Sequence, residues 1–303
     1  MYQPPLNTVP LAPMPALRKL VAATLTPQFR EAAVLVEEPL PEPGPGEVLI
    51  RNSVAGVNAS DVNVAAGRYT PGAVPPVDLG FEAAGEVIAV GEGVEHLAVG
   101  DCAATSLLGG GFRTHQLAKA KLAIPVPAAT PEVLSILVSG LTASIALETQ
   151  GALKPGETVL VTAAAGGTGQ YAVQLAKRAG CRVLGTCSTD AKVDLLRTLG
   201  CDRPINYKTE NLKAVLKKEA PKGLDVVYES VGGRMFDTAL RALAVHGRLI
   251  SIGFIGEYVD GPERVTDVRV YHRLLAKSAS VRGVFLPHFA RHFRPHMERL
   301  VGL

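Results

Sequence analysis

The pattern of apolar and polar positions changes character near the middle of the chain. From Lys19 to about Ser139, short apolar runs alternate with glycine and proline clusters such as Pro41–Gly46 and Gly109–Gly111. This punctuation predicts mostly β-structure in a compact, barrel-like domain. The expected strands are Lys19–Leu25, Ala32–Glu37, Glu47–Asn58, Gly85–Val90 and Phe112–Ala118.

Beyond a short predicted helix at Thr142–Thr149, apolar runs alternate with amphipathic stretches of helical period. This alternation is typical of an α/β domain with a doubly wound parallel sheet. We expect strands at Thr158–Ala163, Arg182–Thr186, Leu224–Tyr228, Gly247–Ile252 and Ser280–Phe285. The expected helices are Gly169–Ala179, Asp190–Leu199, Asn211–Ala220 and Arg234–Ala244.

The first strand and helix of this series enclose a glycine-rich turn, Ala164-Ala165-Gly166-Gly167-Thr168-Gly169. It matches the dinucleotide-binding pattern G-x-G-x-x-G, except that alanine replaces the first glycine. Glycines let the backbone turn tightly and approach a pyrophosphate, and the helix N-terminus favours the phosphate charge. We therefore predict that Gly166, Gly167, Thr168 and Gly169 bind a dinucleotide.

The end of the second strand indicates whether the dinucleotide is NAD(H) or NADP(H). An NAD site usually carries an acidic residue there, whereas this strand ends at Ser188. We interpret Asp190 as the N-cap of the next helix. Ser188 can donate to a phosphate oxygen and Lys192 can supply positive charge, which favours NADP(H). The alternative for Lys192 is a solvated surface lysine.

Composition narrows the class of protein. The chain has 303 residues, 47% hydrophobic and 19% charged, and a net charge of +3 without a basic block, so we expect no nucleic-acid partner. We expect no apolar run of membrane-spanning length and no membrane partner. The four cysteines show no Cys-x-x-Cys spacing, which argues against disulfides and structural zinc and favours a reducing compartment.

Several stretches in both halves point to one family. They are Gly56–Asp61 (GVNASD), Gly80–Glu82 (GFE), Ala163–Gln174, Asp225–Gly233, and the runs CDRPINYKTE and VVYESVGG. From Leu17 to about His296 the chain resembles the zinc-independent branch of the medium-chain dehydrogenase/reductases, which contains quinone oxidoreductases and enone reductases. The resemblance implies an N-terminal GroES-like β-barrel domain followed by a doubly wound Rossmann domain.

We accordingly predict four segments. Residues 1–16, where Met1–Pro15 carries five prolines, form a disordered tail. Residues 17–140 form the GroES-like catalytic domain, and residues 141–286 form the NADP-binding domain. Residues 287–303 begin a return to the catalytic domain that stops short, because relatives continue past Leu303.

The resemblance also implies the cofactor contacts, which fall on Thr168, Ser188, Lys192, Tyr207, Ser230, Ile252 and Phe254. Ser188, Lys192 and the Tyr207 hydroxyl would surround the 2′-phosphate of NADP(H). Ser230, Ile252 and Phe254 follow strands, at the edge where open α/β sheets bind ligands. An ordinary half-buried tyrosine is the alternative for Tyr207.

We predict no metal. Zinc-dependent relatives carry cysteine where this chain has Asn58 and histidine where it has Phe81, and neither replacement is a useful zinc ligand. His288, His292 and His296 recur at helical spacing, but Pro295 would interrupt a helix and the neighbours are basic. We interpret these histidines as a solvated or partly packed surface.

Without zinc, a conjugated ketone is the expected substrate, because hydride attack at its β-carbon requires only donors at the oxygen. Asn58 and Tyr69 are the candidate catalytic donors, and both contact substrate in this hypothesis, with Tyr258 bordering the substrate pocket. By resemblance, the substrates are 15-keto prostaglandins, reduced at the 13,14 double bond. The alternatives are an NADPH quinone reductase and a truncated nucleotide-binding protein with little activity.

Assembly and location are expectations from the same resemblance. We expect a homodimer that pairs the last sheet strand, near Ser280–Phe285. The resemblance implies the peroxisome, and the cytoplasm is the alternative because Val301-Gly302-Leu303 does not match a peroxisomal signal.

Overall fold

The computed structural model describes residues 16–262 and 268–302. The predicted tail at 1–16 lies almost wholly outside the described residues. The chain divides into two compact units between Leu134 and Ser135, whereas the predicted boundary was at 140/141. Each unit is described separately below.

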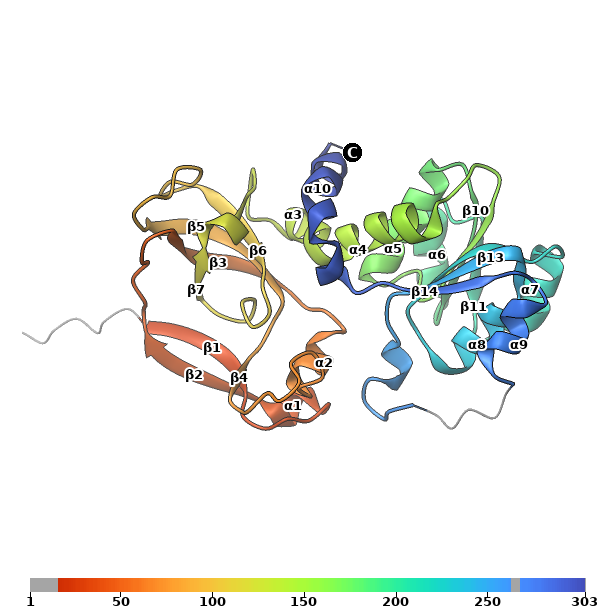
Figure 1. Ribbon diagram of the computed structural model, residues 1–303, viewed down its shortest axis with the longest axis horizontal. Helices are drawn as coiled ribbons and strands as arrows, with labels where there is room; N and C mark the ends of the chain where they lie inside the picture. The colour runs from red at the N-terminus through yellow and green to blue at the C-terminus, as the bar shows by residue number, and fades with distance from the viewer. Residues whose placement is uncertain (1–15, 263–267, 303) are drawn as a thin grey trace, which may run out of the picture. The chain divides into compact units, whose positions relative to one another are not determined.

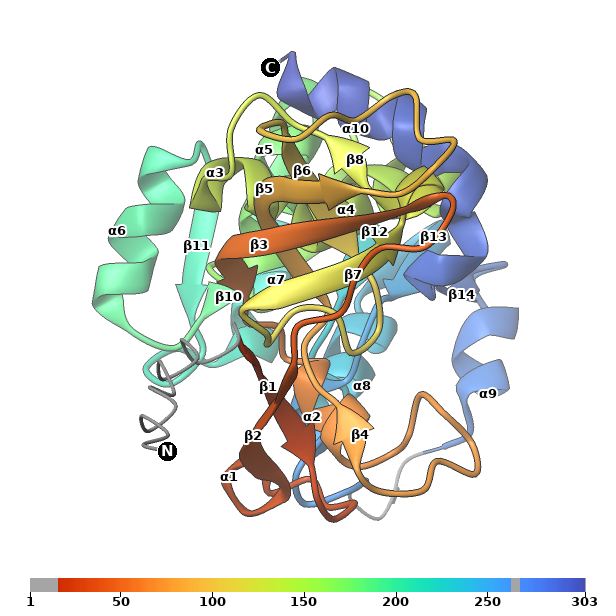
Figure 2. The same ribbon diagram turned by 90° about the vertical axis from the view of Figure 1, so that its left-hand side faces the viewer.

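The first unit contains two antiparallel sheets (Figure 2). The smaller has strand order β2-β1-β4 and the larger β7-β3-β5-β6-β8. The five predicted strands correspond to β1, β2, β3, β5 and β7, with ends shifted by a few residues. The bounds are β1 Ala16–Ala22, β2 Ala33–Pro39, β3 Glu47–Gly56, β4 Val77–Asp78, β5 Glu82–Val90, β6 Cys102–Ser106, β7 His115–Lys119 and β8 Ile124–Pro125.

The first unit also contains short helices that the sequence did not predict, α1 at Phe29–Ala32, α2 at Asp61–Ala65 and a single turn at Ala120–Leu122. Helix α2 is the next element after β3, and four of its five residues are buried. Val64 and Ala65 of this helix pack with Ala22 and Leu79 in one apolar cluster. This packing fixes the segment between Asn58 and Tyr69 against the smaller sheet.

The second unit is built on a six-stranded parallel sheet of order β11-β10-β9-β12-β13-β14 (Figure 1). Its central strands are mostly apolar because helices cover both faces. The bounds are β9 Thr158–Val161, β10 Arg182–Cys187, β11 Arg203–Asn206, β12 Leu224–Glu229, β13 Leu243–Ser251 and β14 Ser280–Gly283. The helices are α5 Gly167–Arg178, α6 Asp190–Thr198, α7 Leu212–Glu219, α8 Gly233–Arg241 and α9 Val270–Leu275, with a turn at Ile255–Glu257.

The helix predicted at Thr142–Thr149 is longer than expected and runs from Pro131 to Gly151. It comprises α3 Pro131–Ser135, a π-helical stretch at Ile136–Gly140, α4 Leu141–Ile145 and a second π-helical stretch at Ala146–Gly151. Its 21 residues are long and apolar enough to cross a membrane, so the expectation of no such run was wrong. This is weak evidence for a membrane span, because core helices of soluble proteins meet the same criteria and 44% of its apolar window is buried.

The last described elements are a helical turn at Leu286–His292 and α10 at Phe293–Val301. The three histidines do not share one continuous α-helix, as predicted. His288 lies in the kinked 3-10 segment, whereas α10 begins at Phe293 with Pro295 in its first turn, where no intrahelical N–H is needed. The interpretation of His296 as a surface residue was wrong. His296 is buried, and its Nδ1 lies 2.7 Å from Ser144 Oγ of α4.

Candidate functional site

The glycine-rich loop joins β9 to α5 at the carboxyl edge of the sheet. A Cβ atom at Gly169 would lie 2.4 Å from the Ala163 carbonyl oxygen, so only glycine allows α5 to pack this closely on the loop. The alanine that replaces the first glycine is accommodated by Gly185 of β10. A Cβ atom at Gly185 would lie 2.9 Å from the Cβ of Ala164.

Helix α5 begins at Gly167, and both Gly166 and Gly167 are exposed. The first N–H groups of a helix have no intrahelical acceptor, so the Gly167 and Thr168 amides suit a phosphate oxygen. The Thr168 hydroxyl lies 3.1 Å from the Ser139 carbonyl oxygen, to which it can donate, and 2.6 Å from the Tyr228 hydroxyl. Tyr228 is fully buried, and burial raises its pKa, so it remains neutral and fixes the loop.

The predicted 2′-phosphate residues follow two adjacent strands. Ser188 directly follows β10. Tyr207 follows β11, and its backbone N–H donates to the Cys187 carbonyl oxygen at 3.1 Å. Lys192 is exposed in the first turn of α6. Tyr207 is 41% exposed, which leaves its ring available to a ligand.

The interpretation of Asp190 as the N-cap of α6 was wrong. Thr189 is the N-cap, and its hydroxyl oxygen accepts the Lys192 N–H at 3.3 Å. Asp190 is the first helical residue, and its carboxylate accepts from the Asn206 side-chain amide at 2.8 Å. Threonine and aspartate are both good N-caps, so their order alone did not decide between them.

Ser230 follows β12 and is held by Thr162 at the end of β9. The Ser230 N–H donates to Thr162 Oγ1 at 2.9 Å, and Ser230 Oγ donates to the Thr162 carbonyl oxygen at 3.3 Å. The fully buried Glu229 was not predicted from sequence. Its Oε1 accepts the Val231 and Gly232 amides at 2.9 and 3.1 Å, and burial raises its pKa. This carboxyl group shapes the turn that carries Ser230.

Ile252 and Phe254 follow β13. The Ile252 N–H donates to the Glu229 carbonyl oxygen at 2.8 Å, while the Phe254 ring is 46% exposed. The Tyr258 ring meets the Phe254 ring edge-on at 5.0 Å between centroids and is only 7% exposed. Tyr258 therefore supports Phe254, and its predicted contact with substrate stays a prediction.

In the first unit, Asn58 lies between β3 and α2, and hydrogen bonds hold both its backbone and its side chain. Its backbone N–H donates to Asp61 Oδ2 at 2.7 Å, and its Nδ2 donates to Glu82 Oε1 at 3.0 Å. Gly56 leaves the space that Glu82 occupies, because a Cβ atom there would lie 2.2 Å from Glu82 Oε1. Burial raises the pKa of Asp61 to about 6.

Tyr69 belongs to a second polar group of the same unit. Its hydroxyl accepts from Asn63 Nδ2 at 3.2 Å, and Asn63 Oδ1 accepts from Arg68 Nη1 at 2.8 Å. Its ring meets Phe81 edge-on at 5.9 Å. Phe81 therefore fills apolar space at the position where a zinc ligand would be required.

The residues present do not fit zinc. Asn58 offers an amide that is already bonded to a carboxylate, and Phe81 offers no ligand atom. Across residues 16–262 and 268–302, no group of three or more His, Cys, Asp or Glu side chains is placed to hold a metal ion. The prediction of a metal-independent reaction remains open to measurement.

The structure thus brings together all the predicted cofactor residues at one edge of the second unit's sheet. It places Asn58 and Tyr69 in the first unit. Glu229, Thr162 and Tyr228 are the residues that sequence reasoning missed. Each is a polar residue in or directly after an apolar strand, and that is the only signal that the sequence offered.

Both halves of the chain match known protein families. Residues 44–128 match the alcohol dehydrogenase GroES-like domain, and residues 167–301 match the family described as zinc-binding dehydrogenase. The chain is 50% identical over 291 residues to prostaglandin reductase-3 of Mus musculus, across 95% of this chain and 77% of that protein. It is 46% identical to a probable quinone oxidoreductase of Leishmania amazonensis, across 94% of this chain and 85% of that protein.

Two similar solved structures contain NADPH. One is the quinone oxidoreductase of Escherichia coli complexed with NADPH, at 29% identity and a TM-score of 0.80, covering 94% of this chain and 86% of that chain. The other is a mycobacterial protein complexed with NADPH, at 32% identity and a TM-score of 0.80 with the same coverage. These likenesses confirm the predicted fold, a GroES-like domain followed by a Rossmann domain.

Proposed function

Because the chain belongs to the medium-chain dehydrogenase/reductase family, we propose that it reduces conjugated ketones with NADPH, and that 15-keto prostaglandins are its substrates. The coarse activity, an NADPH-dependent enone or quinone reductase, rests on the relatives in both of those classes. The observation that carries the finer proposal is the 50% identity to prostaglandin reductase-3 across 95% of the chain.

The cofactor is NADP(H), and the residues present fit it. Gly169 lets α5 pack on the loop, exposed Gly166 and Gly167 leave the backbone open, and Lys192 supplies charge beyond β10. Bound NADPH supplies a hydride from the nicotinamide ring. In this proposal Ser230, Ile252 and Phe254 hold the nicotinamide end, while Ser188, Lys192 and Tyr207 hold the 2′-phosphate.

The chain's own contribution to the reaction is hydrogen bonding to the substrate oxygen. When the β-carbon of an enone gains a hydride, negative charge grows on the carbonyl oxygen. Asn58 Nδ2 has two protons, and Glu82 accepts one of them, so the second is oriented for substrate. Its anchoring by Asp61 and Glu82 holds the amide in place before substrate arrives.

Tyr69 is the second donor in the proposed site. A hydroxyl that accepts a hydrogen bond becomes a stronger donor, and Tyr69 accepts from Asn63. Arg68 polarises the Asn63 amide from its other end. Tyr69 thus stabilises the same oxygen as Asn58, and the α-carbon takes its proton afterwards from water or from a tyrosine.

Steady-state oxidation of NADPH by the full chain tests the proposal. We expect turnover with a 15-keto prostaglandin, and a product reduced at the 13,14 double bond. Faster turnover with a naphthoquinone, and none with the prostaglandin, would favour a quinone reductase, which the Leishmania relative supports. NADPH binding without turnover on either substrate would favour a nucleotide-binding protein with little activity.

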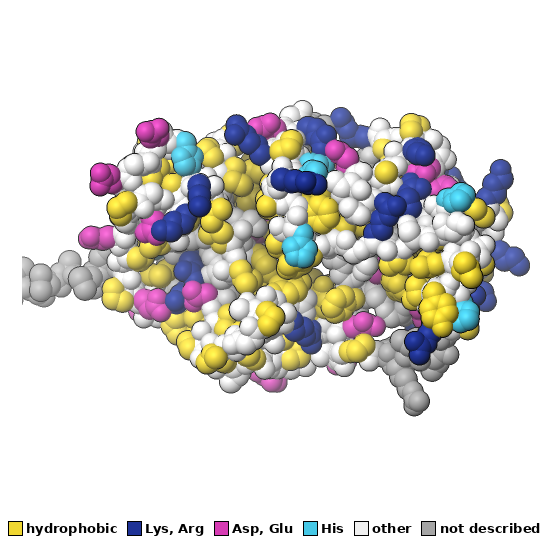
Figure 3. Space-filling view, viewed as in Figure 1, with side chains coloured by type: hydrophobic (Ala, Val, Ile, Leu, Met, Phe, Trp, Pro, Cys, Tyr) yellow, Lys and Arg dark blue, Asp and Glu magenta, His cyan; other side chains and the backbone are white. Residues whose placement is uncertain are grey.

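We also propose a homodimer formed through β14. This strand is the last in the sheet order, so one of its edges has no partner strand among the described residues. Hydrophobic side chains gather in the part of the second unit's face where β14 lies in the same view (Figure 3). Light scattering at micromolar concentration tests the dimer. Peroxisomal location is proposed from the resemblance alone, and cell fractionation tests it against the cytoplasm.

A further inference from the structure

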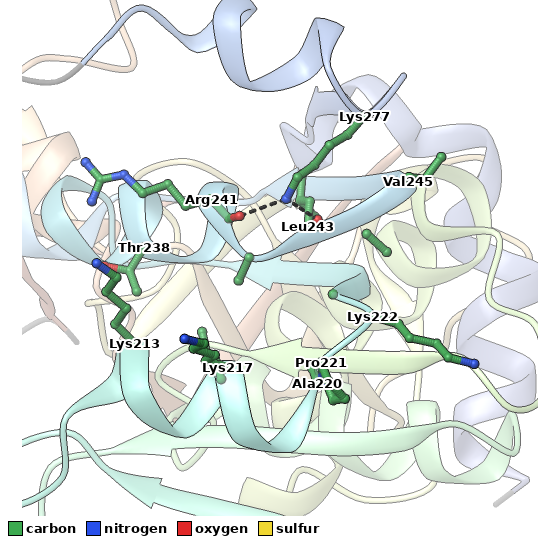
Figure 4. A pocket seen from close by; sticks show the side chains of 14 residues that line it. Lys213, Lys217, Ala220, Pro221, Lys222, Thr238, Arg241, Leu243, Val245 and Lys277 are labelled. Carbon is green, nitrogen blue, oxygen red and sulfur yellow. Dashed lines mark hydrogen bonds between the residues drawn. The ribbon is translucent and has the colours of Figure 1, made fainter.

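A cavity lies at the opposite end of the second unit's sheet from the cofactor residues. Its volume is about 370 Å³, within the range of ~300–1,000 Å³ typical of small-ligand sites. It is lined by α7, the residues between α7 and β12, the C-terminal part of α8, the start of β13, and Lys277 (Figure 4). The cofactor residues instead follow the carboxyl ends of the strands, so this cavity is a separate place.

The cavity combines an apolar floor with a cationic rim. The floor is made of aliphatic side chains, Leu216, Ala220, Pro221, Ala242, Leu243, Ala244 and Val245. The rim carries five cations, Lys213, Lys217, Lys222, Arg241 and Lys277. Among the described residues that line it there is no Asp or Glu. Such a lining attracts negative charge and still offers apolar surface.

The cations have different local roles. Lys277 donates its ammonium protons to the carbonyl oxygens of Arg241, the last residue of α8, and of Leu243, the first residue of β13. Lysines at the C-terminal end of a helix stabilise it, and this accounts for Lys277 and Lys217. Lys213 differs, because it lies in the first turn of α7, where a positive charge opposes the helix dipole and no acidic residue offsets it.

Three lysines of the rim, Lys213, Lys217 and Lys222, have no carboxylate partner in the described part of the chain. Burial, and then the charge of Arg273, lower the pKa of Lys277. Figure 4 shows Lys213 and Lys217 rising from α7 on one side of the cavity and Lys277 entering from the other, whereas Lys222 points away.

We propose that this cavity binds an anionic amphiphile, a carboxylate or phosphate attached to an aliphatic chain. The anionic group would be held by Lys213, Lys217 and Lys277, and the aliphatic chain would lie on Ala220, Pro221 and Val245, which keep exposed apolar surface. The lysines alone would suit any anion, and the apolar floor alone would suit any aliphatic ligand. Their combination selects a ligand that carries both parts. The site is independent of the proposed reductase activity.

Isothermal titration of the full chain, saturated with NADP⁺, tests this site. The three probes are decanoate, inorganic phosphate and decanol. Decanoate carries both a negative charge and an aliphatic chain, phosphate carries only the charge, and decanol carries only the aliphatic chain. We expect decanoate to bind at one site per chain, about tenfold or more tighter than either of the other two. Equal affinity for phosphate would overturn the aliphatic part of the proposal, and equal affinity for decanol would overturn the anionic part.

Matched variants locate the binding. Lys217→Glu should weaken decanoate by about tenfold or more, because a repelling carboxylate replaces an attracting ammonium. Lys218→Glu makes the same charge change at the next position of α7, outside the cavity lining, and should alter decanoate affinity much less. Unchanged NADPH affinity and melting temperature would show that both variants fold. Equal losses in the two variants would show that decanoate responds only to overall charge, or binds elsewhere, and would refute the site.

Discussion

Two regions of the molecule position their functional groups by different means. The first is the nucleotide edge, the carboxyl edge of the second unit's sheet with the loop Gly166–Gly169. The second is the donor cluster of the first unit, which contains Asn58 and Tyr69. At the nucleotide edge, much of the binding surface is backbone, and the important side chains are the ones that are missing, as at Gly167 and Gly169. In the donor cluster, every functional group is a side chain braced by another, as Asn58 is by Glu82. Added atoms should therefore abolish cofactor binding at the nucleotide edge, whereas removal of side-chain atoms should lower turnover at the donor cluster.

The strongest test of the nucleotide edge is Gly167→Val. A Cβ atom at this position would lie 2.8 Å from Ser139 Oγ, and the valine branches would cover the exposed amides at the start of α5. We expect NADPH binding to be lost while the first unit stays folded. Cofactor titration and circular dichroism measure the two effects. Affinity close to that of the parent chain would show that the backbone of this loop does not approach the cofactor.

The equivalent test of the donor cluster is Asn58→Ala. Loss of one donor to a developing oxyanion typically lowers turnover by about 10²–10³-fold, and Tyr69 would reduce this loss if the two share the role. NADPH affinity should change little. Asn52→Ala is the control, since the Asn52 amide donates to the Arg113 carbonyl oxygen instead. Full turnover in the Asn58 variant, or a defect confined to NADPH binding, would remove Asn58 from the mechanism.

Lys192→Ala tests whether a side chain adds selectivity at the nucleotide edge. We expect it to weaken NADPH by about 1.5–3 kcal/mol, the value of a charge-assisted contact, and to leave NADH almost unchanged. Lys218→Ala removes an equivalent charge from α7 and should affect neither cofactor. Binding constants for both cofactors decide the matter. The same loss for NADPH and NADH would show that Lys192 does not contact the 2′-phosphate.

The smallest expected effect is on the free energy of unfolding, through Asp61, which accepts the Asn58 N–H. The pKa of Asp61 is raised to about 6 in the folded chain, above the value of 3.8 for an unperturbed side chain. Its ionisation therefore destabilises the fold as pH rises through this interval, by about 1–3 kcal/mol above pH 6. Asp61→Asn keeps an oxygen for the Asn58 N–H and should raise stability at pH 7.

Denaturant unfolding of both chains at several pH values measures this effect. The gain in stability from Asp61→Asn should shrink as pH falls below 6 and disappear below about pH 3, where the parent aspartate is neutral in both the folded and unfolded states. A gain that is the same at pH 4 and pH 7 would show that ionisation of Asp61 is not its cause.

The sequence predicted what is local and missed what depends on distant contacts. The β9–α5 loop was recognisable because its strand, glycines and helix are contiguous. Strand β11 was missed because Arg203–Asn206 has only four residues, one of them proline, and is defined by pairing with β10. Buried Glu229 could not be predicted because one of its partners, Thr162, lies far away in the chain.

The two predicted sites differ in the same way. The placement of Ser188 and Ser230 at one edge of the sheet was predictable because the carboxyl ends of parallel strands meet there. The partners of Asn58 and Tyr69 are set by side-chain packing around α2, which no short pattern encodes. The π-helical stretches within Pro131–Gly151 explain why the helix predicted there was too short, since their period departs from that of an α-helix.

The contact between Ala164 and Gly185 shows that the space a dinucleotide loop requires belongs to two neighbouring strands together. Ala164 follows β9 and Gly185 lies in β10, where a Cβ atom would lie 2.9 Å from the Ala164 Cβ and 3.0 Å from Cys201 Sγ. A search confined to the contiguous motif finds only the first of these two residues, although the shape of the loop depends on both.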